Sequence, residues 1–307
     1  MRQVFASIGE AMVEFAPEAD GRFRRGFAGD TLNTAWAVRA LTDPDTVSVR
    51  YVSACGSDPL SGQLVAFLDD AGIDTAHVRR IDARRIGLYL ISLDGHERSF
   101  HYWRETSAAR LLAADPDWLT ATLRDVDMAY LSGITLAILS PEHRDTLFDV
   151  LAGFRARGGT LAFDGNVRLA LWRDRAEAAA ALERACRLAH IALPTADDEL
   201  LLFDDGDAVG TARRLAGWGV REVVVKRGPD PCLLMTAQGV EAIPALPVAD
   251  AIDTSGAGDG FNGAYLAARL AGHAPAGAVR RAHAVAARVI RTRGAILPMD
   301  LLRAAVA

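Results

Sequence analysis

The side chains best suited to chemistry lie together in one short segment, DTSGAGDGF, at residues 253–261. Gly256, Ala257 and Gly258 are small and precede an amphipathic run, so they leave backbone N–H groups open at the start of a predicted helix. Such a turn binds anions, and phosphate oxygens in particular, through these donors and the helix dipole. Asp259 follows in the same first turn. Its carboxylate either complements the dipole or acts as a general base beside a bound γ-phosphate.

Two other nucleotide-binding motifs are excluded by the residues around this segment. Gly258, Gly260 and Gly263 formally satisfy GxGxxG, but a dinucleotide site also needs an acid about 20 residues later. After Asp259 the next acid is Asp300, so the sequence argues against nicotinamide binding. No GxxxxGK[ST] sequence occurs, which excludes a P-loop.

The chain contains a single lysine, Lys226, in the segment VVVKRG. It follows a predicted strand, at the edge where open α/β sheets bind ligands. Two interpretations stay open: the lysine is a chance survivor in an arginine-biased chain, or it contacts a ligand.

Composition narrows the class of protein. The chain has 307 residues, of which 50% are hydrophobic and 24% are charged, and this globular composition allows one large α/β domain or two smaller ones. The net charge of −5 argues against a general nucleic-acid or acidic-membrane binder, since both need a cationic surface. No apolar run approaches the ~18 residues of a membrane span, and the three cysteines are widely separated. We therefore expect a soluble protein of the reducing cytoplasm.

The elements that must position these residues follow a strand–helix rhythm. Residues 3–15 alternate like a strand, and residues 28–41 predict a helix. Two β-rich runs within 86–104 flank Asp94-Gly95, which predicts a hairpin. The second half predicts a parallel sheet with helices on both faces. Its expected elements are strands at 127–133, 160–164, 190–193 and 221–228, helices at 141–159, 175–188 and 207–218, a β-rich stretch at 231–248 and two last helices at about 257–271 and 275–291.

Several of these segments resemble a known family in register along nearly the whole chain. DTSGAGDGF resembles the DTxGAGD signature of the ribokinase-like (PfkB) carbohydrate kinases, and AGDTLNTAWAVRAL resembles their sugar-binding GG-x-x-x-N-x-A motif. More narrowly, GFAGDTLNTA, GLYLISLDGHERSFHYWR, YLSGITLAILSPEHR, VVVKRG and RGAILP resemble the kinases of 2-dehydro-3-deoxygluconate (KDG). The resemblance implies a ribokinase-like α/β fold with a central, mainly parallel sheet. It implies one domain over 1–307, with a small β-sheet lid from segments near 10–30 and 86–104.

The resemblance also implies catalytic roles. Asp259 would be the base that takes the proton of the sugar hydroxyl as it attacks the γ-phosphorus of ATP. The amides of Gly256, Ala257 and Gly258 would form the anion hole, with Mg²⁺ bridging the phosphates. Asp253 would order the loop, beside a monovalent cation such as K⁺.

Sugar contacts are implied by the N-terminal motif at Gly29, Asp30 and Asn33. Helix capping together with a buried hydrogen bond is the alternative for the two polar side chains. The chain departs from the family at Ala28, where the motif usually has glycine, and this puts close approach of the substrate in question.

The carboxylate of KDG requires fixed positive charge in the sugar site, and the planar fork of arginine suits it. FHYWR places Tyr102 and Arg104 on one strand face, with Tyr89 on the partner strand. DGNVR places Asn166 and Arg168 just beyond a predicted strand, at the ligand edge. The resemblance implies KDG contacts at Tyr89, Tyr102, Arg104 and Arg168.

Nucleotide contacts are implied at Asn166, Arg168, Lys226, Arg227 and Gly228, together with Gly256 and Gly258. Across the family an N-x-x-E motif orders Mg²⁺ and phosphate, and here TADDE puts Thr195 and Asp198 in those positions. KDG kinases tend to share that change, so a role of Asp198 through Mg²⁺ stays open.

The function expected from the sequence is ATP-dependent phosphorylation of KDG at its terminal hydroxyl, which gives the 6-phosphate. The alternatives are another PfkB sugar kinase such as a fructokinase, or a non-catalytic sugar-binding relative. KDG and its C4 epimer are not separated by the sequence, because one inverted hydroxyl depends on a single contact. We expect a homo-oligomer that binds neither nucleic acid nor membranes.

Overall fold

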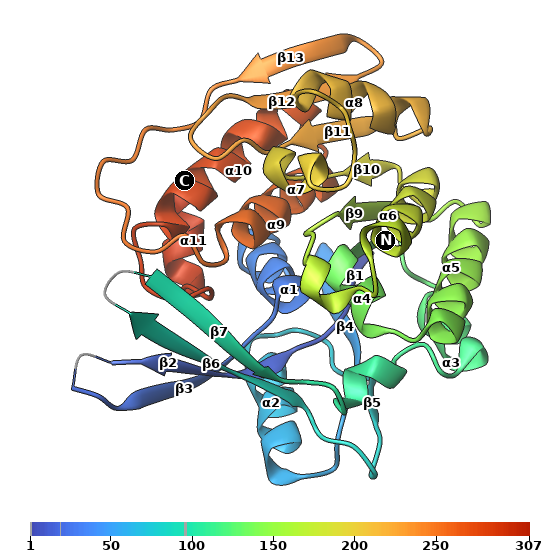
Figure 1. Cartoon of the computed structure of the whole chain (residues 1–307), viewed down its shortest axis with the longest axis vertical. Helices are drawn as coiled ribbons and strands as arrows, with labels where there is room; N and C mark the ends of the chain where they lie inside the picture. Colours follow the sequence, from blue (N-terminus) through green and yellow to red (C-terminus); the bar gives the residue numbers. More distant parts are fainter. Residues whose placement is uncertain (1, 19, 95–96) are drawn as a thin grey trace.

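The computed structural model describes residues 2–18, 20–94 and 97–307, and its centre is a nine-stranded sheet (Figure 1). The strand order is β13-β12-β11-β10-β9-β8-β1-β4-β5. Neighbours from β5 to β11 pair in parallel, and β12 and β13 add antiparallel strands at one edge. The strands are β1 (Gln3–Ile8), β4 (Val47–Cys55), β5 (Val78–Arg80), β8 (Met128–Ser132), β9 (Thr160–Asp164), β10 (Ile191–Ala192), β11 (Glu222–Val225), β12 (Cys232–Thr236) and β13 (Gly239–Ile243).

Helices cover both faces of this sheet, because successive strand residues point to opposite sides. In β8, Ala129 and Leu131 pack into one apolar layer, and Met128 and Tyr130 pack into the other. The first layer contains α3 (Pro116–Thr122), α4 (Gly133–Ile138), α5 (Pro141–Ala156), α6 (Arg175–Leu188), α7 (Ala196–Leu200) and α8 (Ala208–Gly217). The second contains α1 (Asp30–Leu41), α2 (Pro59–Asp70), α9 (Ala257–Leu270), α10 (Pro275–Val289) and α11 (Met299–Val306). No helix of the described residues is long and apolar enough to cross a bilayer.

A second sheet of four strands, in the order β3-β2-β6-β7, projects at the lower left of Figure 1. Its strands are β2 (Met12–Pro17), β3 (Phe23–Ala28), β6 (Gly87–Asp94) and β7 (Glu97–Trp103). Tyr89 of β6 lies directly opposite Tyr102 of β7. Of the predicted Asp94-Gly95 turn, Gly95 lies outside the described residues. The large, mostly parallel sheet with a second small sheet confirms the predicted fold class.

Two expectations about element boundaries were wrong. Residues 3–15 do not form one strand, because β1 ends at Ile8 and β2 begins at Met12 in the other sheet. The break falls at Gly9, where a Cβ would lie 2.4 Å from Thr31 Oγ1, so the backbone turns closely against α1. After α9 and α10 the chain also forms a third helix, α11, which the sequence reading missed. Its eight residues begin directly after Pro298 and pack on α1 and α10.

Candidate active site

A cavity of about 680 Å³ opens at the carboxyl ends of β9, β10 and β11, where ligands bind in open α/β sheets. The starts of α1 and α9 and one face of the second sheet complete its wall. The sequence-predicted residues that line it are Gly29, Asp30, Asn33, Tyr89, Tyr102, Arg104, Asn166, Arg168, Asp198, Lys226, Gly256, Gly258 and Asp259. Four other predicted residues, Ala257, Arg227, Gly228 and Asp253, do not line it.

Asp259 occupies the first turn of α9 and faces this cavity. Its Oδ2 accepts a hydrogen bond of 2.8 Å from Asn33 Nδ2, although 226 residues separate the two in sequence. Burial, and after it the negative charge of Asp30, raises the pKa of Asp259 to about 7. The carboxylate is therefore held in place by α1 and tuned to exchange a proton near neutral pH, as a general base requires.

Asp30→Asn is expected to move the acidic limb of the kcat/KM–pH profile to lower pH. Asp259 must be deprotonated to act as a base, and removing a like charge beside it lowers its pKa. Asn33→Ala gives a control of opposite sign, because the hydrogen bond from Asn33 lowers the pKa of Asp259. Steady-state kinetics between about pH 5 and 9 measure both shifts. If the acidic limbs of the two variants shift in the same direction, Asp259 is not the group that titrates.

The turn before α9 requires glycine at position 256. Gly256 is the N-cap residue with φ of 71°, and a Cβ there would lie 2.6 Å from the Ala295 carbonyl oxygen. The Ala257 N–H donates to the Thr254 carbonyl oxygen at 3.2 Å, so this predicted anion-hole amide is used within the turn. Gly256 and Gly258 are the residues of the predicted anion hole that line the cavity. Both glycines lie at the positive end of a 14-residue helix, where an anion is stabilised.

Asp253 ties this turn to the loop after α10. Its Oδ1 accepts from the Ser255 N–H at 2.9 Å, and its Oδ2 accepts from the Gly294 N–H at 2.8 Å. Both carboxylate oxygens thus hold backbone amides, which is the loop-ordering role that the resemblance implied. The expected K⁺ beside Asp253 stays a prediction.

At the start of α1, the predicted sugar-binding residues join the strand edge. Asp30 Oδ2 accepts from Asn166 Nδ2 at 2.8 Å, and Asn166 adopts a left-handed φ of 34°, which asparagine tolerates. A Cβ on Gly29 would lie 2.3 Å from the Glu10 carbonyl oxygen, so the close approach needs glycine. Ala28 instead lies in β3 opposite Met12 and does not line the cavity, and its methyl packs in the core of the second sheet.

The two predicted carboxylate-binding arginines differ in environment. Arg104 is only 6% exposed, and its Nε donates to Glu10 Oε2 at 2.8 Å, while its guanidinium carbon lies 5.6 Å from the centre of the Tyr102 ring. Arg168 is 53% exposed, and its Nη1 lies 3.8 Å from Asp198. Sequence reasoning missed Glu10, whose only local signal was an acid directly after an apolar strand.

Lys226 forms a buried polar cluster beneath the turn of α9. Its Nζ lies 2.7 Å from Asp164 Oδ2 and 3.0 Å from Asn262 Oδ1, and Asn262 Nδ2 also donates to Asp164 at 2.6 Å. A Cβ built on Gly258 would lie 3.7 Å from the Lys226 Nζ. Sequence reasoning located the lysine but missed Asp164 and Asn262, which belong to β9 and α9 and come together only in the fold.

A magnesium ion fits the cavity only with help from the nucleotide. No group of three or more His, Cys, Asp or Glu side chains able to hold a metal exists within the described residues. Asp198 lines the cavity, and its Oδ2 accepts from the Val167 N–H at 3.1 Å. Burial raises the pKa of Asp198. Mg²⁺ characteristically uses one or two carboxylates together with waters and substrate phosphates, so this donor set suits an ion that enters with ATP.

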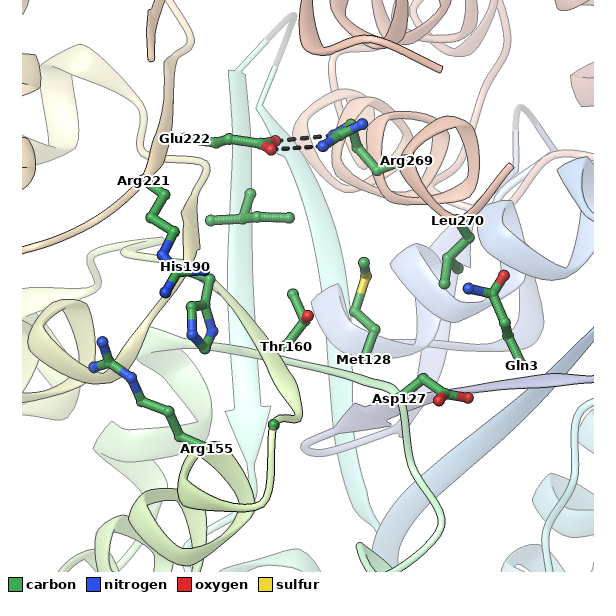
Figure 2. Close-up of a pocket in the computed structure, with 12 residues that line it drawn as sticks. Gln3, Asp127, Met128, Arg155, Thr160, His190, Arg221, Glu222, Arg269 and Leu270 are labelled. Carbon is green, nitrogen blue, oxygen red and sulfur yellow. Dashed lines mark hydrogen bonds and ion pairs between the residues drawn. The ribbon is translucent and has the colours of Figure 1, made fainter. Parts of the chain in front are cut away.

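Figure 2 shows a second cavity, of about 660 Å³, at the opposite, amino-terminal edge of the central strands. Arg269 and Glu222 form a two-armed ion pair with N–O distances of 2.6 and 2.9 Å. Arg155, in the last turn of α5, donates to the Arg187 carbonyl oxygen near the end of α6. These cations therefore satisfy helix carboxyl ends and the partly buried Glu222, as structural arginines do. The cavity with Asp259 is the candidate active site.

Known proteins resemble this chain over nearly its whole length. A family model described as pfkB family carbohydrate kinase matches residues 3–301. The 2-dehydro-3-deoxygluconokinase of Dickeya dadantii is 40% identical over 97% of this chain and 98% of that protein. The enzyme of the same name from Escherichia coli K12 is 40% identical over 99% of this chain and 100% of that protein. A fructokinase of Salmonella typhimurium is more distant, at 28% identity over 87% of this chain and 85% of its own length.

Solved structures share the fold at lower identity. A fructokinase from Xylella fastidiosa with bound ATP superposes with a TM-score of 0.85 at 21% identity, covering 100% of this chain and 98% of that chain. A proposed ribokinase II from Escherichia coli in complex with ATP and Mg²⁺ gives 0.84 at 24% identity, covering 100% and 99%.

Proposed function

Since this chain belongs to the PfkB family of carbohydrate kinases, we propose that it phosphorylates 2-dehydro-3-deoxy-D-gluconate with ATP, at the terminal hydroxyl. One observation carries the proposal: a cavity holds the carboxylate of Asp259 at the amino end of α9 and two arginines, Arg104 and Arg168, from other elements. A base and an anion-binding turn serve phosphoryl transfer, and the arginines serve a substrate that carries a carboxylate.

In the proposed mechanism Asp259 takes the proton of the terminal hydroxyl while the sugar oxygen attacks the γ-phosphorus in line. The new O–P bond forms as the bond to ADP breaks, and the proton leaves Asp259 for solvent after the sugar phosphate departs. Asn33 orients the carboxylate. The amides of Gly256 and Gly258 stabilise the charge that spreads over the phosphoryl oxygens. Mg²⁺, when bound with ATP, neutralises part of the phosphate charge.

At the sugar end, we propose that Arg104 and Arg168 bind the substrate carboxylate and that Tyr89 and Tyr102 flank it. At the nucleotide end, the turn after β11 supplies Arg227 and Gly228, which lie outside the cavity itself. The Arg227 Nη1 donates to the Pro231 carbonyl oxygen at 3.2 Å, so the Arg227 side chain supports this turn.

The two alternatives are less consistent with the site. A fructokinase has a neutral substrate and gains nothing from two arginines in the sugar site. A non-catalytic sugar binder has no use for a base beside a phosphate-binding turn. Identity of 40% to two 2-dehydro-3-deoxygluconokinases, against 28% to the fructokinase, supports the sugar acid.

The test is ADP release from Mg-ATP with KDG, its C4 epimer, fructose and ribose as acceptors. We expect a sugar acid to be turned over with kcat/KM at least about a hundredfold above fructose, because its carboxylate accepts charged hydrogen bonds, each worth about 1.5–3 kcal/mol, that a neutral sugar cannot accept. Assays in K⁺ and in Na⁺ test the cation expected beside Asp253. A preference for fructose or ribose would overturn the sugar-acid assignment, and a failure to release ADP with any of the four acceptors would favour the non-catalytic alternative.

We further propose a cytoplasmic homo-oligomer that pairs through the second sheet. Phe23 and Trp103, on the two opposite edge strands of this sheet, are exposed at 47% and 57%, and large exposed apolar side chains together with open strand edges suit pairing with a second copy. Light scattering measures the oligomeric state, and a monomer at micromolar concentration would contradict the proposed homo-oligomer.

A further inference from the structure

Glu10 occupies a position between the two sheets that the mechanism above does not use. It lies between β1 and β2, lines the active-site cavity, and its side chain is 1% exposed. The Nε and Nη2 atoms of Arg104 both donate to one oxygen, Oε2, of this carboxylate. Arg104 follows β7, so the contact joins segments 94 residues apart across the mouth of the sugar site.

The other oxygen, Oε1, is buried and has no hydrogen-bond partner among the described residues. It lies against Gly87 at the start of β6, where a Cβ would be 2.8 Å from Oε1 and 3.3 Å from the Arg104 Cβ. The missing side chain at Gly87 therefore makes the room that the ion pair occupies. A buried ion pair is weak evidence for stability, because well-packed apolar residues usually do as well or better. Its retention beside a ligand cavity calls for another reason.

We propose that Glu10 is the positioning residue of the sugar-acid subsite, and that it fixes the Arg104 guanidinium so that its remaining N–H groups, on Nη1 and Nη2, meet the substrate carboxylate. The proposal rests on the proposed function. With Nε and one N–H of Nη2 held by Glu10 and the guanidinium set beside the Tyr102 ring, the plane of the guanidinium and the direction of its three remaining N–H groups are fixed.

The ion pair between Glu10 and Arg104 gives the two arginines different roles in binding the sugar acid. Glu10 compensates the charge of Arg104, so the cavity without substrate does not contain an isolated buried cation. Arg168 is half-exposed, and its Nη1 donates to the Val167 carbonyl oxygen at 2.7 Å and lies 3.8 Å from Asp198, so its charge is less tightly paired with an acid than that of Arg104. Arg168 supplies attraction for the sugar acid, and Arg104 supplies a directed hydrogen bond that a neutral sugar does not use.

The test is a double-mutant cycle on Glu10 and Arg104, in which the substitution at Glu10 keeps a carboxylate. Glu10→Asp shortens the side chain by one methylene and withdraws the carboxylate from Arg104, so the overall charge of the cavity is unchanged. We expect the KM for the sugar acid to rise about tenfold, as for loss of one charged hydrogen bond, with kcat and the KM for ATP within about twofold. Arg104→Met should raise the same KM, and in that background Glu10→Asp should add less than about twofold.

Glu222→Asp is the matched control, because it shortens the acid of another arginine pair at the far edge of the sheet. It should change none of these constants. Isothermal titration of the sugar acid without ATP gives a readout independent of turnover, and calorimetric unfolding reports whether each variant is folded. If Glu10→Asp raises KM equally with and without Arg104, or lowers kcat instead, the positioning role is wrong. The wild-type enzyme is assayed with sugar acids first. If it does not phosphorylate them, the proposed function itself is wrong.

Discussion

Asp259→Asn is expected to lower kcat by about 10³-fold or more, while the dissociation constant of the sugar acid stays within about threefold. Asparagine has the shape of aspartate and its Oδ1 still accepts the 2.8 Å hydrogen bond from Asn33, so the first turn of α9 keeps its geometry. It takes up no proton near neutral pH, so the attacking hydroxyl has no base. Binding should be spared, because the proposed substrate contacts come mainly from α1, the second sheet and the loop after β9.

Two measurements separate this effect from a folding defect. Coupled ADP release gives kcat, and isothermal titration gives the affinity for the sugar acid. Asp250→Asn is the control, since Asp250 precedes the same turn but is 72% exposed and pairs with Arg291 at the surface. We expect that variant to match the wild type. A kcat for Asp259→Asn within about tenfold of the wild type would assign the base to another group.

The wild type should also lose kcat/KM as the pH falls below about 7, because protonation of Asp259 removes the base. This limb should be absent from the residual activity of Asp259→Asn. The position of the limb depends on burial and on the charge of Asp30, neither of which is visible in the GAGD motif itself.

The sequence predicted those parts of the fold that depend on short segments of neighbouring residues. Nearly continuous apolar runs marked the buried strands β8 and β9, and the helix predicted from Pro141 does begin there as α5. The helix predicted over 207–218 corresponds to α8, whose N-cap residue is Asp207. The pattern misled at residues 3–15, because β1 and β2 keep the same alternation across Gly9 while changing sheets. Periodicity reports which face is apolar, and it does not report which sheet a strand joins.

The sequence predicted which residue types belong to the site, but it did not predict which of them contact one another. Asn33 and Asp259 are 226 residues apart, and Lys226 and Asp164 are 62 apart, so no spacing rule connects them. The sequence indicated that Arg104 could bind a carboxylate. It did not indicate that Glu10 already holds two of its nitrogens. Chemistry follows from side-chain type, whereas the charge left over for a ligand depends on partners that only the fold brings together.

Lys226→Met is expected to produce two separate losses. The first is stability: Asp164 is 4% exposed, and removing its cation leaves a buried charge without compensation, which costs about 3–5 kcal/mol of the free energy of unfolding. The second is turnover: the ammonium lies beneath the anion-binding turn, 3.7 Å from a Cβ built on Gly258, and lines the cavity. We expect kcat/KM to fall by about 10²–10³-fold, the usual effect of removing one preorganised stabilising group.

The double variant Lys226→Met with Asp164→Asn separates the two losses, because it removes both charges together. The neutral amide that replaces the Asp164 carboxylate leaves no buried charge, so most of the free energy of unfolding should return, as calorimetry would show. Turnover should stay low, because the positive charge near the transferring phosphoryl group is still absent. Asp164→Asn alone keeps the ammonium and should retain more activity than either variant without Lys226. Recovery of wild-type kcat/KM in the double variant would mean that Lys226 serves only to neutralise Asp164, and the lone lysine of the chain would then be structural.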